Sequence, residues 1–309
     1  MEDYKQTLLL LISTPLYALL IGVEMIMSSL HHRKLYSVKD TITNVYLTSL
    51  NFGLELLIRV FCLGFLAYFF SFRVISIDNP YLYWPLLLVL QDIAFYFEHR
   101  VDHYCRFFWA VHVTHHSSEK FNLTTGFRSS VFQPLYRFVY FIPLAFLGFK
   151  PLDIMFMYSA TQIYGILIHT QYINKLGFLE YFMATPSHHR VHHASNTIFL
   201  DKNMGMVFII WDKIFGTFAS EDDLKNEQIR FGLTKNIDRP HHPIDIVFHE
   251  WRNIADDLKK DIPFTTKLKY VFMPPGWSHD GSRKTSKQLR EELLNPNSAL
   301  ENTESLKQL

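Results

Sequence analysis

Residues 107–128 of the sequence read FFWAVHVTHHSSEKFNLTTGFR. This stretch is apolar and aromatic, yet it carries three histidines in the pattern H-x-x-H-H: His112, His115 and His116. In a helix, residues at positions i, i+3 and i+4 project within about 100° of arc, so the three imidazoles would point the same way. A lone histidine on an apolar face is usually a hydrogen-bonded core residue. Three histidines at this spacing instead indicate metal ligation.

Ten of the sixteen histidines fall between residues 99 and 193, and most of them repeat a helical spacing. His99 and His103 are four residues apart, and residues 189–193 repeat the H-x-x-H-H pattern. His169 follows a long apolar segment and is a further candidate. The predicted metal ligands are His99, His103, His112, His115, His116, His169, His189, His192 and His193.

Nine imidazoles exceed what one ion can bind, because zinc takes three or four protein ligands and octahedral ions take at most six. We therefore expect two metal ions. Imidazole ligation suits zinc, iron, copper or nickel. The only two cysteines, Cys62 and Cys105, are far apart in the sequence and give neither a disulfide framework nor a thiolate metal site.

Other residues lie close to these groups in the sequence. Asp92 and Tyr96 precede His99 by seven and three residues on one helical stripe. A carboxylate there can accept the second ring N–H of a ligand histidine and fix its tautomer, so Asp92 is a candidate for that role. Thr185 and Pro186 signal the start of a helix, and His188 beside them is left open between a metal ligand and a residue that bonds the backbone at this helix start.

The composition favours a membrane protein. Of the 309 residues, 49% are hydrophobic and 16% are aromatic, which is high for a soluble domain. The net charge is +1, so the sequence gives no reason to expect a nucleic-acid partner. Apolar segments near residues 8–30, 45–72 and 81–97 are long enough to span a bilayer, and residues 132–149 and 151–168 suggest a hairpin that spans or re-enters it.

The charge of the loops predicts the topology. The loop after the first apolar segment holds Arg33, Lys34 and Lys39, whereas the loop after the second holds only Arg73. Because short cytoplasmic loops are enriched in Lys and Arg, the first loop is expected to face the cytoplasm. Alternation of the segments then brings every predicted metal ligand to the cytoplasmic face.

The fold class that we expect is all-α: a multi-pass integral membrane protein with four to five transmembrane or re-entrant helices and a cytoplasmic histidine-rich helical cap. Residues 1–80 would form the N-terminal transmembrane helices and residues 81–218 a di-metal catalytic domain, in which residues 204–218 lie docked or at the interface. Residues 219–309 would be a soluble cytoplasmic segment. Its last thirty or so residues are polar and are expected to be partly disordered.

At these residues the sequence resembles a known family. HRVDH at 99–103, HVTHH at 112–116, HRVHH at 189–193 and NMGMVFIIWDKIFGTF at 203–218 are similar to the histidine boxes and following signature of the fatty acid hydroxylase superfamily, which includes sterol desaturases. HHSSEKFNLTTGFR at 115–128 looks most like the alkylglycerol monooxygenase branch. Within that stretch Glu119 and Asn122 are candidates for supporting the site, although Asn122 can instead cap a helix that starts at Leu123.

The resemblance implies a membrane-bound di-iron oxygenase that uses O₂ to hydroxylate an unactivated C–H bond of a lipid, in this branch the carbon next to an ether oxygen. Zinc can substitute in binding, but it is not redox-active. Electrons would come from a separate donor protein or a diffusible reductant, for which the branch suggests tetrahydrobiopterin. Two alternatives remain: a lipid or sterol desaturase on the same scaffold, and a histidine-rich membrane carrier or sensor of metal ions.

Overall fold

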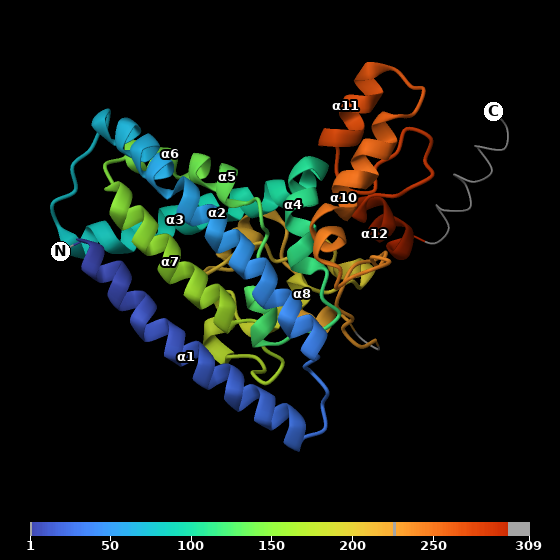
Figure 1. Ribbon diagram of the computed structural model, residues 1–309, viewed down its shortest axis with the longest axis horizontal. Helices are drawn as coiled ribbons and strands as arrows, with labels where there is room; N and C mark the ends of the chain where they lie inside the picture. The colour runs from blue at the N-terminus through green and yellow to red at the C-terminus, as the bar shows by residue number, and fades with distance from the viewer. Residues whose placement is uncertain (1, 225–226, 296–309) are drawn as a thin grey trace.

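The computed structural model describes residues 2–224 and 227–295. These residues form α-helices and short 3₁₀ helices, with two isolated β-bridges and no β-strand among them (Figure 1). The all-α prediction is therefore confirmed for these residues. The α-helices are α1 (Glu2–Leu30), α2 (Val38–Ser71), α3 (Pro80–Tyr104), α4 (Arg106–His116), α5 (Pro134–Arg137), α6 (Ile142–Phe146), α7 (Pro151–Leu167), α8 (Pro186–His192), α9 (Ile210–Phe215), α10 (Pro243–Leu258), α11 (Phe264–Phe272) and α12 (Ser286–Leu294). Short 3₁₀ helices are η1 (Leu123–Phe127), η2 (Phe138–Phe141), η3 (Gly177–Tyr181), η4 (Thr197–Phe199) and η5 (Glu221–Asp223).

Two helices in the described part of the chain are long and apolar enough to cross a membrane, namely Leu11–Leu30 within α1 and the whole of α2. Only 17% and 11% of their most apolar windows are buried inside the protein. The core helix of a soluble protein would be mostly buried, so these exposed apolar faces fit contact with lipid. Helices α3 and α7 pack beside these two helices (Figure 1), but they are not among the candidate membrane spans. The total number of membrane spans therefore stays a prediction.

The predicted hairpin of residues 132–168 has one broken arm and one regular arm. The first arm is divided into α5, η2 and α6, and Pro134 and Pro143 stand at the starts of α5 and α6. Proline lacks the backbone N–H that would continue a helix through these points. The turn before α7 passes through Gly148 with φ +92°, where a Cβ atom would lie 2.1 Å from the carbonyl oxygen of Ile75. Only glycine allows the turn to approach that loop so closely.

The segment of residues 204–218 docks against α3, as predicted. Asp92 on α3 accepts hydrogen bonds from the backbone N–H groups of Val207 (2.8 Å) and Phe208 (3.0 Å) and from the indole of Trp211 (2.9 Å). The ring of Phe215 stacks on Tyr96 with centroids 5.3 Å apart. These contacts hold the segment after the last histidine group against the helix that carries the first.

The prediction of a soluble C-terminal segment from residue 219 is incomplete, because α10 and α11 pack against α4. Arg106 at the start of α4 binds Glu250 (2.7 Å) and Asp257 (2.6 Å), both on α10. Part of the stretch expected to be partly disordered forms α12. A capping box closes its first turn: the backbone N–H of Gln288 donates to Thr285 Oγ1 at 3.4 Å, and the backbone N–H of Thr285 donates to the Gln288 side chain at 2.9 Å. Residues 296–309 lie outside the described residues.

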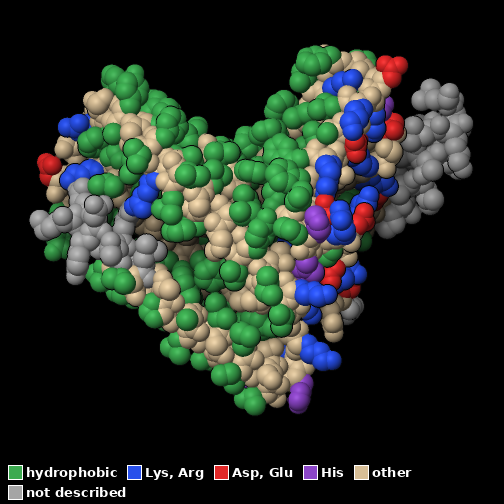
Figure 2. All heavy atoms as spheres, viewed as in Figure 1, with side chains coloured by type: hydrophobic (Ala, Val, Ile, Leu, Met, Phe, Trp, Pro, Cys, Tyr) green, Lys and Arg blue, Asp and Glu red, His purple; other side chains and the backbone are tan. Residues whose placement is uncertain are grey.

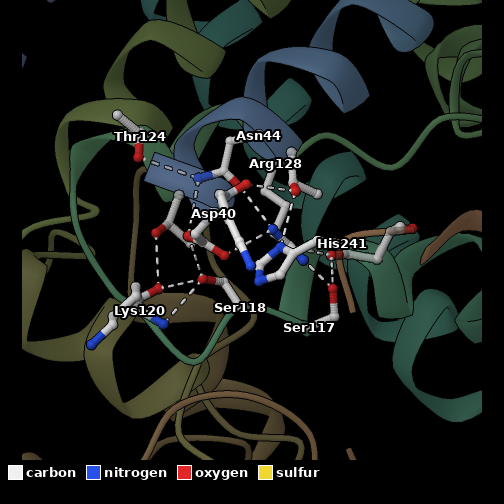
Figure 3. A network of polar contacts seen from close by, with 12 residues as sticks. Asp40, Asn44, Ser117, Ser118, Lys120, Thr124, Arg128 and His241 are labelled. Atoms are coloured by element: carbon white, nitrogen blue, oxygen red, sulfur yellow. Dashed lines mark hydrogen bonds and ion pairs between the residues drawn. The ribbon is translucent and has the colours of Figure 1, made fainter. Parts of the chain in front are cut away.

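A buried arginine joins the second apolar helix to the histidine-bearing helix α4 (Figure 3). Arg128 is fully buried, and its guanidinium donates to the carbonyl oxygen of Thr114 and the hydroxyl of Ser117, both at 3.0 Å. It also donates to Asp40 (3.2 Å) and Asn44 (2.8 Å), in the first two turns of α2. Burial lowers the pKa of Arg128 to about 10, so the side chain stays charged at neutral pH. The end of α4 is thereby fixed to the start of α2.

Replacing Arg128 by alanine should lower the free energy of unfolding by about 3–5 kcal/mol, because the Asp40 carboxylate would stay buried without its partner. Denaturant unfolding in detergent measures this loss. Arg230→Ala is the matched control, since the exposed Arg230–Glu227 pair lies on the surface, and it should change stability by no more than about 0.5 kcal/mol. Equal effects of the two substitutions would contradict this role of Arg128.

Candidate metal centre

All nine predicted ligands meet in two adjacent groups. In each group every histidine offers one ring nitrogen, and these nitrogens lie within 4.8 Å of one another. The residues come from α3, α4, α8 and the segment after α7, which are distant in the sequence. Group A is His99, His103, His112, His116 and His192, and group B is His115, His169, His189 and His193.

Two helices contribute to both groups, which places the groups side by side. On α4, His115 belongs to group B whereas its neighbour His116 belongs to group A. On α8, His192 belongs to group A, and His193 directly after the helix belongs to group B. The rings of His116 and His193 are only 4.5 Å apart. The groups are therefore two positions of one centre.

Backbone carbonyl groups orient many of the rings. The Nδ1 atom of His99 contacts the carbonyl oxygen of Met204 at 2.8 Å, and that of His169 contacts Gly165 O at 2.7 Å. A carbonyl oxygen can only accept, so Nδ1 carries the proton and Nε2 keeps its lone pair. The same pattern holds for Nδ1 of His115 with Arg128 O (3.0 Å) and of His192 with Lys202 O (2.9 Å).

Two further group A rings, those of His112 and His103, contact side chains through Nδ1. The Nδ1 atom of His112 lies 3.2 Å from Ser130 Oγ, and that of His103 lies 3.3 Å from a carboxylate oxygen of Asp201. Asp201, rather than Asp92, therefore provides a carboxylate to a candidate ligand. Such contacts raise the basicity of the ring and fix its orientation for a metal ion.

The inward ring nitrogens fit metal ions. Nε2 of His99 and Nε2 of His112 are 3.0 Å apart in group A, and Nε2 of His169 and Nε2 of His189 are 2.9 Å apart in group B. Since Nδ1 carries the proton in His99 and His169, the Nε2 atoms would present lone pairs to a common point. The buried Nε2 atoms of His103 and His192 have no hydrogen-bond partner among the described residues. Buried, unpaired nitrogen acceptors that converge are suited to bind cations.

Burial also favours the neutral form of many of these imidazoles, which is the form that binds metals. It lowers the pKa of His115 to about 4 and holds the pKa values of His116, His189 and His193 well below the ordinary histidine value. The neighbouring histidines lower them further, because a second positive charge so close would be repelled. The groups are therefore ready to bind cations at neutral pH.

The supporting residues predicted from the sequence lie elsewhere than expected. Asp92 binds the segment of residues 207–211 and not a histidine ring, because the docked backbone and the indole there supply its donors. Glu119 is exposed and accepts a hydrogen bond from Asn236 at 3.0 Å. Asn122 caps η1, as its alternative role predicted, by accepting from the backbone N–H of Thr124 at 2.9 Å. Among the described residues, none of these three side chains forms a hydrogen bond or an ion pair with a histidine of either group.

His188 also lies outside both groups. The backbone N–H of Thr185 donates to its Nδ1 at 3.3 Å, and its Nε2 lies 3.3 Å from Glu180. It therefore bonds the backbone at the start of α8, which was the second of its two predicted roles.

Two residues that the sequence did not single out support group B. Phe121 packs between His169 and Phe231, with ring centroids 5.5 Å and 4.7 Å apart. Glu24 on α1 is buried and accepts hydrogen bonds from the backbone N–H of Leu123 (2.8 Å) and the hydroxyl of Thr170 (2.5 Å). A carboxylate inside an apolar helix is costly without partners, and this signal was available in the sequence.

A polar cavity reaches the centre from the side of α10 and α12. Its volume is about 750 Å³, and its inner wall includes His103, His116, His192 and His193. Charged residues of α4, α10 and the C-terminal region line its other walls. A water-soluble molecule of moderate size could therefore reach the histidine groups.

Comparison with known proteins agrees with this geometry. A family model described as fatty acid hydroxylase matches residues 84–217, which hold all nine histidines. This chain contains a fatty acid hydroxylase domain. No solved structure matches the chain.

The relatives of the chain include enzymes of lipid oxidation. It is 40% identical to human alkylglycerol monooxygenase over 217 residues, which are 70% of this chain and 46% of the human protein. It is 33% identical over 249 residues to alkylglycerol monooxygenase of Danio rerio, covering 76% and 53%. A Delta(7)-sterol 5(6)-desaturase of Gibberella zeae is more distant, at 30% over 168 residues, covering 52% and 50%. The chain thus spans about half the length of the curated relatives it matches.

Removing one histidine from each group should release metal. We expect the purified protein to hold about two metal ions per chain, and His116→Ala or His189→Ala to reduce this to about one or fewer, because each group would lose a ligand that converges on one point. Elemental analysis measures the content. His188→Ala is the control. It removes a buried histidine that lies next to His189 on α8 but belongs to neither group, and the protein should keep both ions. Full metal retention in His116→Ala and His189→Ala would rule out the two groups as the binding sites.

Proposed function

We propose that this protein is a membrane-bound di-iron oxygenase that uses O₂ to hydroxylate an unactivated C–H bond of a lipid. The observation that carries the proposal is the pair of buried all-histidine groups inside a fatty acid hydroxylase domain. The similarity to alkylglycerol monooxygenases supports an ether lipid as substrate, with attack at the carbon next to the ether oxygen.

Iron is proposed for its chemistry rather than its affinity. Imidazole groups bind zinc more tightly than ferrous iron, so the ligand set alone would not select iron. Two bound irons would supply the redox chemistry that activates O₂, which zinc does not. The chain's own contribution is to hold neutral imidazoles in place through Met204 O, Gly165 O and the other partners of Nδ1.

The proposed reaction balances with an external reductant. One C–H bond of the lipid, O₂, two electrons and two protons give one C–OH group and one water. When the hydroxylated carbon also bears the ether oxygen, the product is a hemiacetal. Its C–O bond to the ether oxygen then breaks, the hydroxyl proton passes to that oxygen, and an aldehyde and an alcohol are released.

The position of the centre suits an apolar substrate. Segments next to the histidine groups contact the loop between α1 and α2: Asn122 donates to Leu35 O (2.8 Å), and Lys120 donates to Lys34 O (3.2 Å). The guanidinium of Arg33 lies over the ring of Tyr172 at 4.9 Å. The centre and this basic loop thus lie at one end of the apolar helices, which supports a cytoplasmic orientation. A lipid could reach the centre from the adjoining leaflet.

The polar cavity supports a diffusible reductant. Its charged walls suit a water-soluble molecule, whereas the lipid would approach through apolar surroundings. We propose that the cavity admits the reductant, with tetrahydrobiopterin as the candidate suggested by the alkylglycerol monooxygenase branch. A donor protein that docks at the cavity mouth is the other source of electrons.

Two other functions rank lower. A desaturase begins with the same hydrogen abstraction, and the more distant sterol desaturase relative keeps this option as the alternative within the enzyme class. A metal carrier needs ligands along a path through the bilayer. Here both groups are buried together beside the loop that joins α1 and α2, which favours a fixed cofactor.

The reaction can be tested by lipid analysis under ¹⁸O₂. Cells or liposomes that contain the active protein should show loss of one lipid class and one ¹⁸O atom in its oxidised product. His115→Ala should abolish this labelling because group B loses a ligand. Unchanged labelling in that variant would refute the assignment, and a product with a new double bond and no ¹⁸O would favour the desaturase.

The reductant route predicts a separate kinetic effect. Thr234 lines the outer part of the cavity, and Thr234→Trp should raise KM for a small reductant while KM for the lipid stays the same. Thr234→Ser is the control that keeps the space open. Steady-state kinetics with each substrate varied in turn makes the comparison. An unchanged KM for the reductant, or an equal rise for the lipid, would contradict this route.

A further inference from the structure

Helix α10 exposes an apolar stripe. Ile244, Phe248, Ala255 and Leu258 are exposed, and Trp251 between them is half-buried. Their spacing of four, three, four and three residues places them along one side of the helix. A surface helix of a soluble protein usually turns its apolar residues to the core. Helix α10 does bury Ile246, Val247 and Ile254, but it leaves this second apolar stripe exposed.

The other side of α10 explains this exposure. Asp245 and Asp257 are buried, and both belong with Glu250 to the walls of the polar cavity. Asp257 and Glu250 bind Arg106 of α4, as described above. These buried carboxylates, together with the buried Ile246, Val247 and Ile254, hold one side of α10 against the protein. On the other side, Ile244, Phe248 and Leu258 stay exposed.

Helix α11 continues the same apolar surface. Phe264 and Phe272 are 73% and 56% exposed, and Leu268 lies between them on the same side. Phe107 of α4 connects the two helices, because its ring lies 5.2 Å from Trp251 of α10 and 6.3 Å from Phe272 of α11. We call the apolar stripe that runs along α10 and α11 the hairpin face. It comprises the exposed Ile244, Phe248, Ala255, Leu258, Phe264, Leu268 and Phe272 and the half-buried Trp251.

Apolar contacts link the hairpin face to α2, because Phe132 packs against a cluster that includes Leu47 of α2 and Ile246 and Val247 of α10. Within this region, the ring centroids of Phe248 on α10 and Phe132 are 5.8 Å apart. Further along, Phe138 of η2 contacts Phe61 of α2 at 5.9 Å, and Phe61 is 62% exposed. Figure 2 shows hydrophobic side chains on both arms of the V-shaped notch between these regions, whereas the charged side chains gather on the outer side of the α10–α12 arm.

We infer that α10 and α11 form an amphipathic anchor whose hairpin face lies in the interface of the lipid bilayer. The partner is a bilayer surface because the face continues the exposed apolar surface of α2, a candidate membrane span. Apolar helix faces bury in the boundary between head groups and acyl chains, and their polar sides stay toward water. Here the polar side borders the cavity, so the anchor would hold the mouth of the cavity at the membrane surface.

Spin labels on the full-length protein in phosphatidylcholine liposomes test this inference. Single cysteines at Phe248 and Phe264 probe the hairpin face, and cysteines at the exposed Asp256 and Lys269 are controls on the same helices. The native Cys62 and Cys105 are first replaced by serine. Accessibility to O₂, which concentrates in lipid, is compared with accessibility to a water-soluble nickel chelate.

Labels at Phe248 and Phe264 should be several-fold more accessible to O₂ relative to the chelate than labels at Asp256 and Lys269. Equal, water-like accessibility at all four positions would overturn the inference. Shielding of the hairpin face from both reagents would also overturn it, because a protein partner or second copy would then cover the face. Retained metal content shows that each labelled protein is folded, and the readout does not depend on lipid oxidation.

Discussion

The convergence of nine imidazoles in a buried space is the constraint on which the rest of the structure depends. Burying polar groups without partners is costly, and here the inward nitrogens of His103 and His192 have none among the described residues. The arrangement becomes favourable when cations occupy it. Hydrogen bonds within the fold keep the proton on the outward nitrogen of many of these rings. The inward nitrogen of each such ring therefore has a lone pair available to bind a metal ion.

The apolar helices and the centre are joined by a few buried polar contacts. Glu24 fixes α1 to the segments on either side of group B, and Arg128 fixes the start of α2 to the end of α4. Arg128 acts at the centre in a second way, since its carbonyl oxygen orients His115. These contacts explain how the two histidine groups are held rigidly beside the apolar helices α1 and α2.

The sequence was sufficient to predict which histidines come together, because the spacing of His112, His115 and His116 turns their side chains the same way in a helix. It was not sufficient for the groups that orient them. Backbone carbonyls such as Met204 O carry no residue signature, and Asp92 finds its partners in a segment more than a hundred residues away. The apolar residues of α10 were visible in the sequence, but which of them stay exposed depends on how Arg106 binds Glu250 and Asp257. Only the folded structure brings these residues together.

X-ray absorption at the iron edge of the purified, iron-loaded protein tests the central claim most directly. The account predicts two irons per chain, each coordinated only by nitrogen and oxygen, with the outer-shell scattering that several imidazole rings produce. A single iron per chain, sulfur in the first shell, or the absence of imidazole scattering would contradict it.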